Sequence, residues 1–316
     1  MRDKPGRLAA TLTPMVLGLA LLTAEPLRGH GASSFSEWSA PLNLGPDVNS
    51  PFEDLAPHLS SDGRALYFAS NRPDSQGGED LWVARRPNRQ APWGPATNLG
   101  PMINTSANER SPALSRNRRL LFFATDRAGG SGGFDIWVSW RPDPDDDFGW
   151  QTPVNLGTGI NTAATDAGPG FFERGDRDRW PTRTVIPQLY MASNRPGGPG
   201  GLDIYVGSVP GGWAGPPALV TELSSPQADL TPAVRRDGLE ILFASARPGG
   251  LGGFDLWRAW RRSVHAPWST PTSLGPLINS EFVEVFPSLS FDAETLVFQS
   301  NRPGGFGGSD LYMSTR

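Results

Sequence analysis

Acidic residues recur at one position of a repeated sequence and are the first candidates for chemistry. Each lies three residues before a proline: Asp54, Glu109, Asp166, Asp229 and Glu284. An arginine recurs in every repeat, two residues after a serine or threonine: Arg72, Arg127, Arg195, Arg247 and Arg302. If the repeats close into a ring, five carboxylates at one mouth of its channel could bind a cation or a polar ligand. The alternative is a ring of arginine–carboxylate pairs that ties each repeat to its neighbour.

A second group of candidates lies where the repeats differ. The second repeat has an acidic turn, and the third has 11 extra residues rich in charge. The candidates in these two loops are Asp145, Asp146, Arg174, Arg177, Arg179 and Trp180. Arginine and tryptophan dominate binding hot spots, so the loops could form a contact site for a partner; the alternative is two solvated loops. The strand nearest the channel is expected to begin after the proline of each repeat, so the residues one and three positions after the proline could face the channel. His58 follows the first proline, where the other repeats have Ala, Gly or Ser, so it could line the channel or be a packed histidine. Phe172 and Arg235 lie three residues after their prolines, where the other repeats have Ser, and they too could line the channel.

Two apparent motifs carry no chemistry. The glycine-rich turn of residues 302–310 lacks the Gly-Lys-Ser/Thr of a phosphate-binding loop, and its Asp310 can instead hold the turn by accepting backbone hydrogen bonds. Residues 129–133 match a G-x-S-x-G hydrolase pattern only formally, because they are a copy of this turn with serine at a variable position.

Composition excludes several classes of protein. The chain of 316 residues has no cysteine, which rules out disulfides, thiolate metal sites and a cysteine nucleophile. A net charge of −4 gives no support to nucleic-acid binding, and three histidines make a histidine-rich zinc site unexpected. Gly and Pro, with 38 and 32 copies, disfavour a helical bundle. We expect no cofactor, although calcium is possible.

The elements that must position these residues repeat five times. A tryptophan precedes a proline by 19 residues in every repeat, and an aspartate follows the repeated serine or threonine by 10. Each repeat of about 55 residues contains four short apolar segments separated by Gly- and Pro-rich turns, which is typical of an antiparallel β array. The last repeat lacks its fourth strand, and an extra strand precedes the first repeat. We therefore predict an all-β, five-bladed β-propeller with four-stranded blades, whose last blade is closed by the N-terminal strand.

The repeat also resembles a known family. The pattern Leu-x-Phe-Ala-Ser-Asn-Arg-Pro-Gly-Gly-x-Gly-Gly-x-Asp-Leu-Trp, with Asn-Leu-Gly-x-x-Ile-Asn before it, is similar to the WD-like β-propeller repeats of the TolB type. The resemblance covers residues 38–316 and implies a propeller from a bacterial envelope protein. The α/β domain of TolB is absent, and five blades are counted where TolB has six.

The N-terminus has the pattern of an export signal. Arg2, Lys4 and Arg7 precede an apolar stretch at residues 8–24, and small residues follow. The stretch is short for a membrane span. We predict a signal peptide at residues 1–32, a single propeller domain at 33–316, no membrane span in the mature chain, and a periplasmic or secreted location.

These observations lead to an expected function. The acids are copied in every repeat, whereas glycosidases use carboxylates with different roles. The leading expectation is a monomeric, non-enzymatic scaffold that binds a protein or another ligand, its partner being an envelope protein or a glycan. The alternatives are a carbohydrate-active enzyme, either a hydrolase or a lyase, and a propeller that binds a small ligand or calcium.

Overall fold

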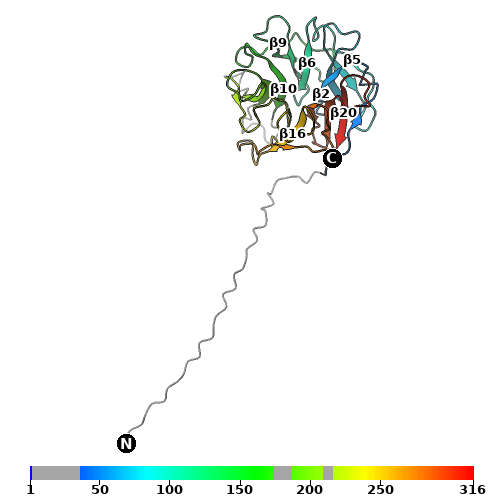
Figure 1. Ribbon diagram of the computed structural model, residues 1–316. Helices are drawn as coiled ribbons and strands as arrows, with labels where there is room; N and C mark the ends of the chain where they lie inside the picture. Colours follow the sequence, from blue (N-terminus) through cyan, green and yellow to red (C-terminus); the bar gives the residue numbers. More distant parts are fainter. Residues whose placement is uncertain (2–35, 174–186, 209–215) are drawn as a thin grey trace. The chain divides into compact units, whose positions relative to one another are not determined.

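Twenty strands form five antiparallel sheets in the computed structural model, which describes residues 1, 36–173, 187–208 and 216–316. The predicted signal peptide lies outside these residues, apart from Met1. Residues Phe35–Arg316 form one unit, in which the sheets surround a common axis as the blades of a propeller (Figure 1). No apolar helix of membrane-spanning length occurs in the described ranges.

Each blade has four strands, ordered from the axis outward. Blade 1 contains β2 (Asp54–Leu59), β3 (Ala65–Ser70), β4 (Asp80–Arg85) and β5 (Thr97–Asn98). Blade 2 contains β6 (Glu109–Leu114), β7 (Leu120–Thr125), β8 (Asp135–Trp140) and β9 (Val154–Asn155). Blade 3 contains β10 (Asp166–Phe172), β11 (Gln188–Ser193), β12 (Asp203–Ser208) and β13 (Ala218–Leu219). Blade 4 contains β14 (Asp229–Val234), β15 (Glu240–Ser245), β16 (Asp255–Trp260) and β17 (Thr272–Ser273). Blade 5 contains β18 (Glu284–Leu289), β19 (Thr295–Ser300), β20 (Asp310–Thr315) and β1 (Leu42–Asn43).

The N-terminal strand closes the ring, as predicted. Strand β1 pairs with β20 in antiparallel register, and Leu42 lies opposite Met313. The innermost strands contact one another in a cycle, β2 to β6, β10, β14, β18 and back to β2. Arg316 adds to this closure, because its guanidinium lies 4.4 Å from the ring of Trp38. The five-bladed fold predicted from the repeats is confirmed.

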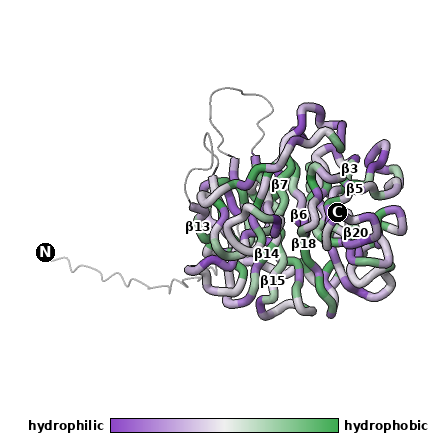
Figure 2. Tube along the Cα trace, turned by 90° about the horizontal axis from the view of Figure 1, so that it is seen from above, coloured by the Kyte–Doolittle hydropathy of each residue, from purple (hydrophilic) through white to green (hydrophobic). Residues whose placement is uncertain are grey.

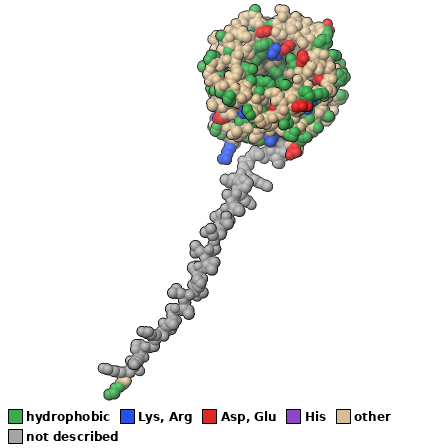
Figure 3. Space-filling model, in the orientation of Figure 1, with side chains coloured by type: hydrophobic (Ala, Val, Ile, Leu, Met, Phe, Trp, Pro, Cys, Tyr) green, Lys and Arg blue, Asp and Glu red, His purple; other side chains and the backbone are tan. Residues whose placement is uncertain are grey.

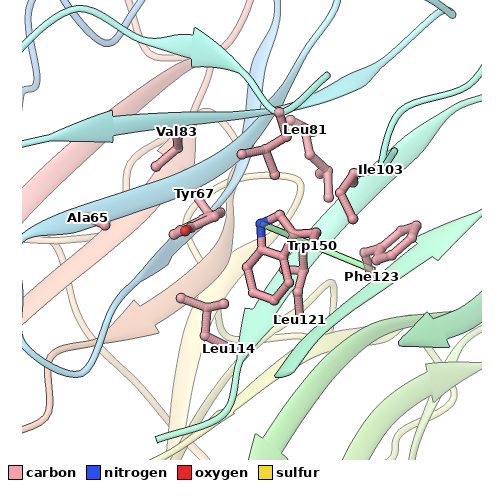
Figure 4. Close-up of a cluster of buried hydrophobic side chains, with 11 residues drawn as sticks. Ala65, Tyr67, Leu81, Val83, Ile103, Leu114, Leu121, Phe123 and Trp150 are labelled. Atoms are coloured by element: carbon pink, nitrogen blue, oxygen red, sulfur yellow. The ribbon is translucent and has the colours of Figure 1, made fainter. Parts of the chain in front are cut away.

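Apolar side chains fill the space between neighbouring blades. Figure 4 shows one such cluster, in which Tyr67 and Leu81 of blade 1 meet Leu121, Phe123 and Trp150 of blade 2. Strands with apolar side chains on both faces are expected where each sheet packs between two neighbouring sheets. Hydrophobic segments accordingly lie within the blades, and hydrophilic ones are concentrated in the turns (Figure 2).

The innermost strands differ from the prediction at their prolines. We expected them to begin after the proline, but each begins three residues earlier, at the repeated acid. The pairing register shifts just before the proline, between Leu55 and His58 in blade 1, and the residue preceding the proline, Ala56, has φ of 50°. Proline cannot donate a ladder hydrogen bond, so it is tolerated at a bulge on an edge strand. The same bulge recurs in all five blades and places the prolines against the axis.

Candidate functional site

The repeated acids and arginines form buried pairs. Every one of the five carboxylates is inaccessible to solvent. The pairs are Arg72–Asp54, Arg127–Glu109, Arg195–Asp166, Arg247–Asp229 and Arg302–Glu284. Both members of each pair belong to the same blade, so the expectation that these pairs tie neighbouring blades together is wrong.

Blade 4 shows what such a pair does. Arg247 Nη2 lies 2.6 Å from Asp229 Oδ1 and donates to the carbonyl of Leu223 at 2.6 Å. The other carboxylate oxygen accepts the backbone N–H of Ser225 at 2.6 Å. The pair therefore fixes the segment that enters the blade. None of the ten repeated side chains lines the cavities found along the axis, so ligand binding by the ring stays a prediction.

An asparagine that recurs in four of the five repeats, in the segment entering each blade, makes hydrogen bonds between blades. Asn279, in the segment entering blade 5, accepts the backbone N–H of Leu256 at 2.8 Å and donates to its carbonyl at 3.0 Å. Leu256 belongs to blade 4, so one amide replaces a missing pair of ladder hydrogen bonds. Asn49, Asn104 and Asn161 repeat this contact at other junctions.

The acidic turn of the second repeat is held by arginines. Asp145 is exposed and lies 2.8 Å from Arg118, and Asp146 accepts the backbone N–H of Phe148 at 2.9 Å. The next residue, Asp147, is buried and accepts hydrogen bonds from Arg141 at 3.0 Å and from the hydroxyl of Tyr67. The other predicted loop residues, Arg174, Arg177, Arg179 and Trp180, lie outside the described residues. The contact site that would need both loops is therefore still a prediction.

A small cavity of about 80 Å³ lies on the axis, among the prolines and their bulges. His58 is in its wall, as expected for a channel-lining residue. The Nε2 atom of His58 accepts the backbone N–H of Leu114 at 3.0 Å, and burial lowers the pKa of His58 to about 4, so the ring is neutral at pH 7. Ser111 also lines this cavity, and its buried hydroxyl has no hydrogen-bond partner among the described residues.

A second cavity, of about 110 Å³, opens at the end of the axis where the first two strands of each blade are connected. Every blade contributes the residue four positions after its proline. We call these five residues the mouth pentad: Ser61, Arg116, Glu173, Arg236 and Phe291. Below them, Leu59, Leu114, Phe171, Val234 and Leu289 form an apolar floor. The mouth therefore combines cationic, acidic and aromatic groups over an apolar base.

Two guanidinium groups converge on one aromatic ring of the pentad. The Cζ atoms of Arg116 and Arg236 lie 4.9 Å and 4.4 Å from the centroid of Phe291. The three residues come from blades 2, 4 and 5, so the cluster spans the mouth. Neither guanidinium makes an ion pair or a hydrogen bond with any residue that the structure describes, which leaves their N–H groups open to a ligand.

Glu173 is the acid of the mouth. One of its carboxylate oxygens accepts the backbone N–H of Arg116 at 3.1 Å. Burial raises the pKa of Glu173, and the hydrogen bond and charge of Arg116 oppose part of this rise. No other carboxyl group lines either axial cavity among the described residues. A carboxyl group with a raised pKa is suited to exchange a proton with a substrate near neutral pH.

Sequence reasoning missed the mouth pentad, although a signal was present. The positions one and three residues after the proline were compared between repeats, but the position four residues after it was not. That position has Ser, Arg, Glu, Arg and Phe in the five repeats, whereas structural positions are copied. Of the two other residues expected in the channel, Phe172 packs in the core between blades 3 and 4 and also borders the second cavity. Arg235 lines neither axial cavity and is paired with Glu240 at 3.0 Å.

The described residues contain no group of three or more His, Asp or Glu side chains that could hold a metal ion. Charged side chains are scattered over the face of the molecule in Figure 3 and form no single large patch there. The mouth is therefore the best candidate for a functional site.

Comparison with known proteins supports the propeller fold. No family model matches the chain, and no curated protein matches it by sequence. The catalytic domain of a GH62 α-L-arabinofuranosidase from Coprinopsis cinerea matches with a TM-score of 0.59 and 14% identity, over 88% of this chain and 96% of that one. An α-L-arabinofuranosidase from Lactobacillus brevis matches with a TM-score of 0.57 and 13% identity, over 86% and 92%. A putative TolB from Agrobacterium tumefaciens matches with a TM-score of 0.47 and 17% identity, over 84% and 78%.

These findings correct the expected function. The prediction of a non-enzymatic binding scaffold is wrong as the leading interpretation, because glycoside hydrolases match this propeller over most of both chains. The match to TolB is too weak to support an argument, so the resemblance is established only as far as the propeller fold. At 12–14% identity the hydrolase matches themselves establish the fold, and the case for an activity must come from the mouth.

Proposed function

We propose that this protein is a carbohydrate-active enzyme that cleaves a glycan at the mouth of the propeller. The observation that carries the proposal is the position of Glu173, the one described carboxyl group on the axial cavities, beside two arginines and an aromatic ring. We assign Glu173 the role of the group that exchanges a proton with the glycan.

The surroundings of Glu173 support this role. An apolar floor and an aromatic ring suit the flat, apolar face of a sugar, and arginines suit its oxygen atoms. Burial raises the pKa of Glu173, so its carboxyl group stays protonated to a higher pH than that of an exposed glutamate. The repeated acids, by contrast, are inaccessible to solvent and paired with arginines, as Asp229 is with Arg247.

The proposal extends to location. The charged, apolar and small-residue pattern at the N-terminus supports export, which would bring the mouth into contact with extracellular or envelope glycans. Fractionation of cells that produce the full chain would test this, and retention in the cytoplasm would contradict it.

The experiment for activity compares the wild-type protein with Glu173→Gln on a panel of polysaccharides, with newly formed chain ends as the readout. We expect cleavage by the wild type, and a loss of about 10²–10⁴-fold in kcat/KM in the variant, which is typical of a removed general acid or base. Glu281→Gln is the matched control, because Glu281 is an exposed acid in the segment that enters blade 5. No cleavage of any glycan by the wild type, or equal rates for wild type and Glu173→Gln, would overturn the proposal.

A further inference from the structure

We infer that the glycan is acidic, and that Arg116 and Arg236 together bind the carboxylate of a uronic acid residue in the mouth. This inference rests on the proposed function, because it names the class of substrate for the same site. It starts from the two guanidinium groups that approach the ring of Phe291 from different blades.

Stacking on Phe291 preorganises the arginines and leaves their donors free. A guanidinium over an aromatic ring uses its flat face, while its five N–H groups lie in its own plane and point away from the ring. Elsewhere in the described structure such arginines are engaged, except for Arg258 over Trp260. Arg247, for example, lies over Phe243 and also pairs with Asp229. Arg116 and Arg236 keep the stacking contact but have no such partner among the described residues.

The charge at the mouth also favours an anion. Two cations face one carboxyl group there, whereas the whole chain has a net charge of −4. A neutral sugar would leave this local excess uncompensated. Planar guanidinium groups match a planar carboxylate through paired N–H···O bonds. A sulfate ester on a sugar shares the negative oxygens but not the planar geometry, so a carboxylate is the better fit.

With a uronate bound, Glu173 as the single described acid of the mouth can also carry out a complete reaction, namely β-elimination. Two arginines on the carboxylate reduce its charge and make the proton on the adjacent C5 atom more acidic. The Glu173 carboxylate takes this proton, and its electron pair forms the C4=C5 double bond as the C4–O bond breaks. In a galacturonate the C5–H and C4–O bonds lie on opposite faces of the ring, so the leaving oxygen takes a proton from a solvent water on the far face, and Glu173 returns its proton to solvent. The single carboxyl group thus serves as the base, no water is consumed overall, and the enzyme returns to its initial state.

Binding is tested first, with Glu173→Gln, which preserves both arginines and does not cleave the probe. The probes are an oligogalacturonate, a neutral galacto-oligosaccharide of equal length and its sulfated form, each titrated by calorimetry. We expect the oligogalacturonate to bind at least 10-fold more tightly than the neutral probe. Replacing either arginine by glutamine should weaken its binding by about 10–100-fold, as expected for a hydrogen bond to a charged group.

Arg119→Gln is the matched control, because Arg119 is an exposed arginine in the same turn as Arg116. Its binding should stay within about twofold of the parent. Equal affinity for acidic and neutral probes would overturn the inference, and so would preference for the sulfated probe. Circular dichroism and thermal melting confirm that each variant is folded.

Turnover by the wild type then separates the two proposals. Elimination produces a conjugated, ultraviolet-absorbing end, whereas hydrolysis does not. Cleavage of a neutral glycan that is insensitive to both arginine variants would retain the proposed function and refute this inference. Tight, arginine-dependent binding of oligogalacturonate without any cleavage would support the carboxylate site and refute the elimination and the proposed function.

Discussion

Replacing Asp229 by asparagine should destabilise the propeller strongly but leave the side chains of the mouth in place. The carboxylate of Asp229 is inaccessible to solvent, and it accepts hydrogen bonds from Arg247 and Ser225 at 2.6 Å each. Asparagine preserves the volume but removes the charge that compensates a guanidinium of which only 12% is exposed. Breaking one partner of a buried ion pair costs about 3–5 kcal/mol, and since Arg247 retains its bond to the Leu223 carbonyl we expect a value near 3.

The assay is urea unfolding followed by tryptophan fluorescence. With a slope of about 3 kcal/mol per M for a unit of this size, a loss of about 3 kcal/mol lowers the midpoint by about 1 M. Glu222→Gln, at an exposed acid in the segment that enters the same blade, should shift the midpoint by less than about 0.2 M. The double variant with Arg247→Met should lose less than the sum of the single losses, because the two residues are directly coupled.

Two outcomes would refute this reasoning. A midpoint for Asp229→Asn within about 0.2 M of the wild type would show that the buried pair contributes little. A stable variant that had lost glycan binding would show instead that the acid ring is a ligand site, as the sequence suggested.

Two further predictions concern the axis and the glycine turns. Because burial lowers the pKa of His58 from 6.5 to about 4, the unfolded chain binds more protons than the folded chain between these pH values. The contribution of His58 to the free energy of unfolding is therefore complete above pH 6.5 and falls by at most about 3 kcal/mol as the pH drops to 4. Thermal melting over this pH range should show a smaller loss for His58→Gln. Gly252→Ala should lower the melting temperature by several degrees, because a Cβ there would lie 1.8 Å from the carbonyl oxygen of Phe282. Gly253→Ala is the control, because its Cβ would meet Val283 at an ordinary 3.6 Å. Equal melting temperatures for the two variants would contradict the close contact.

The repeats made the fold predictable because residues at a constant spacing make the same structural contact in each blade. The aspartate ten residues after the repeated serine or threonine accepts the backbone N–H groups of the glycine turn, as Asp255 does for Leu251 at 2.9 Å. One constant spacing was overlooked: an arginine lies six residues after this aspartate in four repeats and stacks on a tryptophan, as Arg261 does on Trp268 at 4.1 Å. Structural positions of this kind can be read from a single sequence because they occur several times.

The mouth was harder to predict because strand alternation does not reach it. The comparison of positions one and three after the proline assumed that alternate residues of the innermost strand face the channel. The bulge at the proline breaks that alternation, and the pentad lies in the turn just beyond the strand, where no period applies. The approach of Arg116 and Arg236 to Phe291 also joins blades that are distant in sequence, so only the closed ring brings them together.

The same symmetry explains why the repeated acids were a poor guide to function. A group copied in five blades meets five equivalent surroundings, and here each copy is neutralised by its own arginine. A substrate that lies across the axis has no such symmetry, so the groups that orient it must differ from blade to blade. The pentad meets this requirement with five side chains on one repeated backbone position, and three of them, Arg116, Glu173 and Arg236, carry ionisable groups. Exchange of these side chains would change what the mouth binds and leave intact the buried pairs that hold the blades.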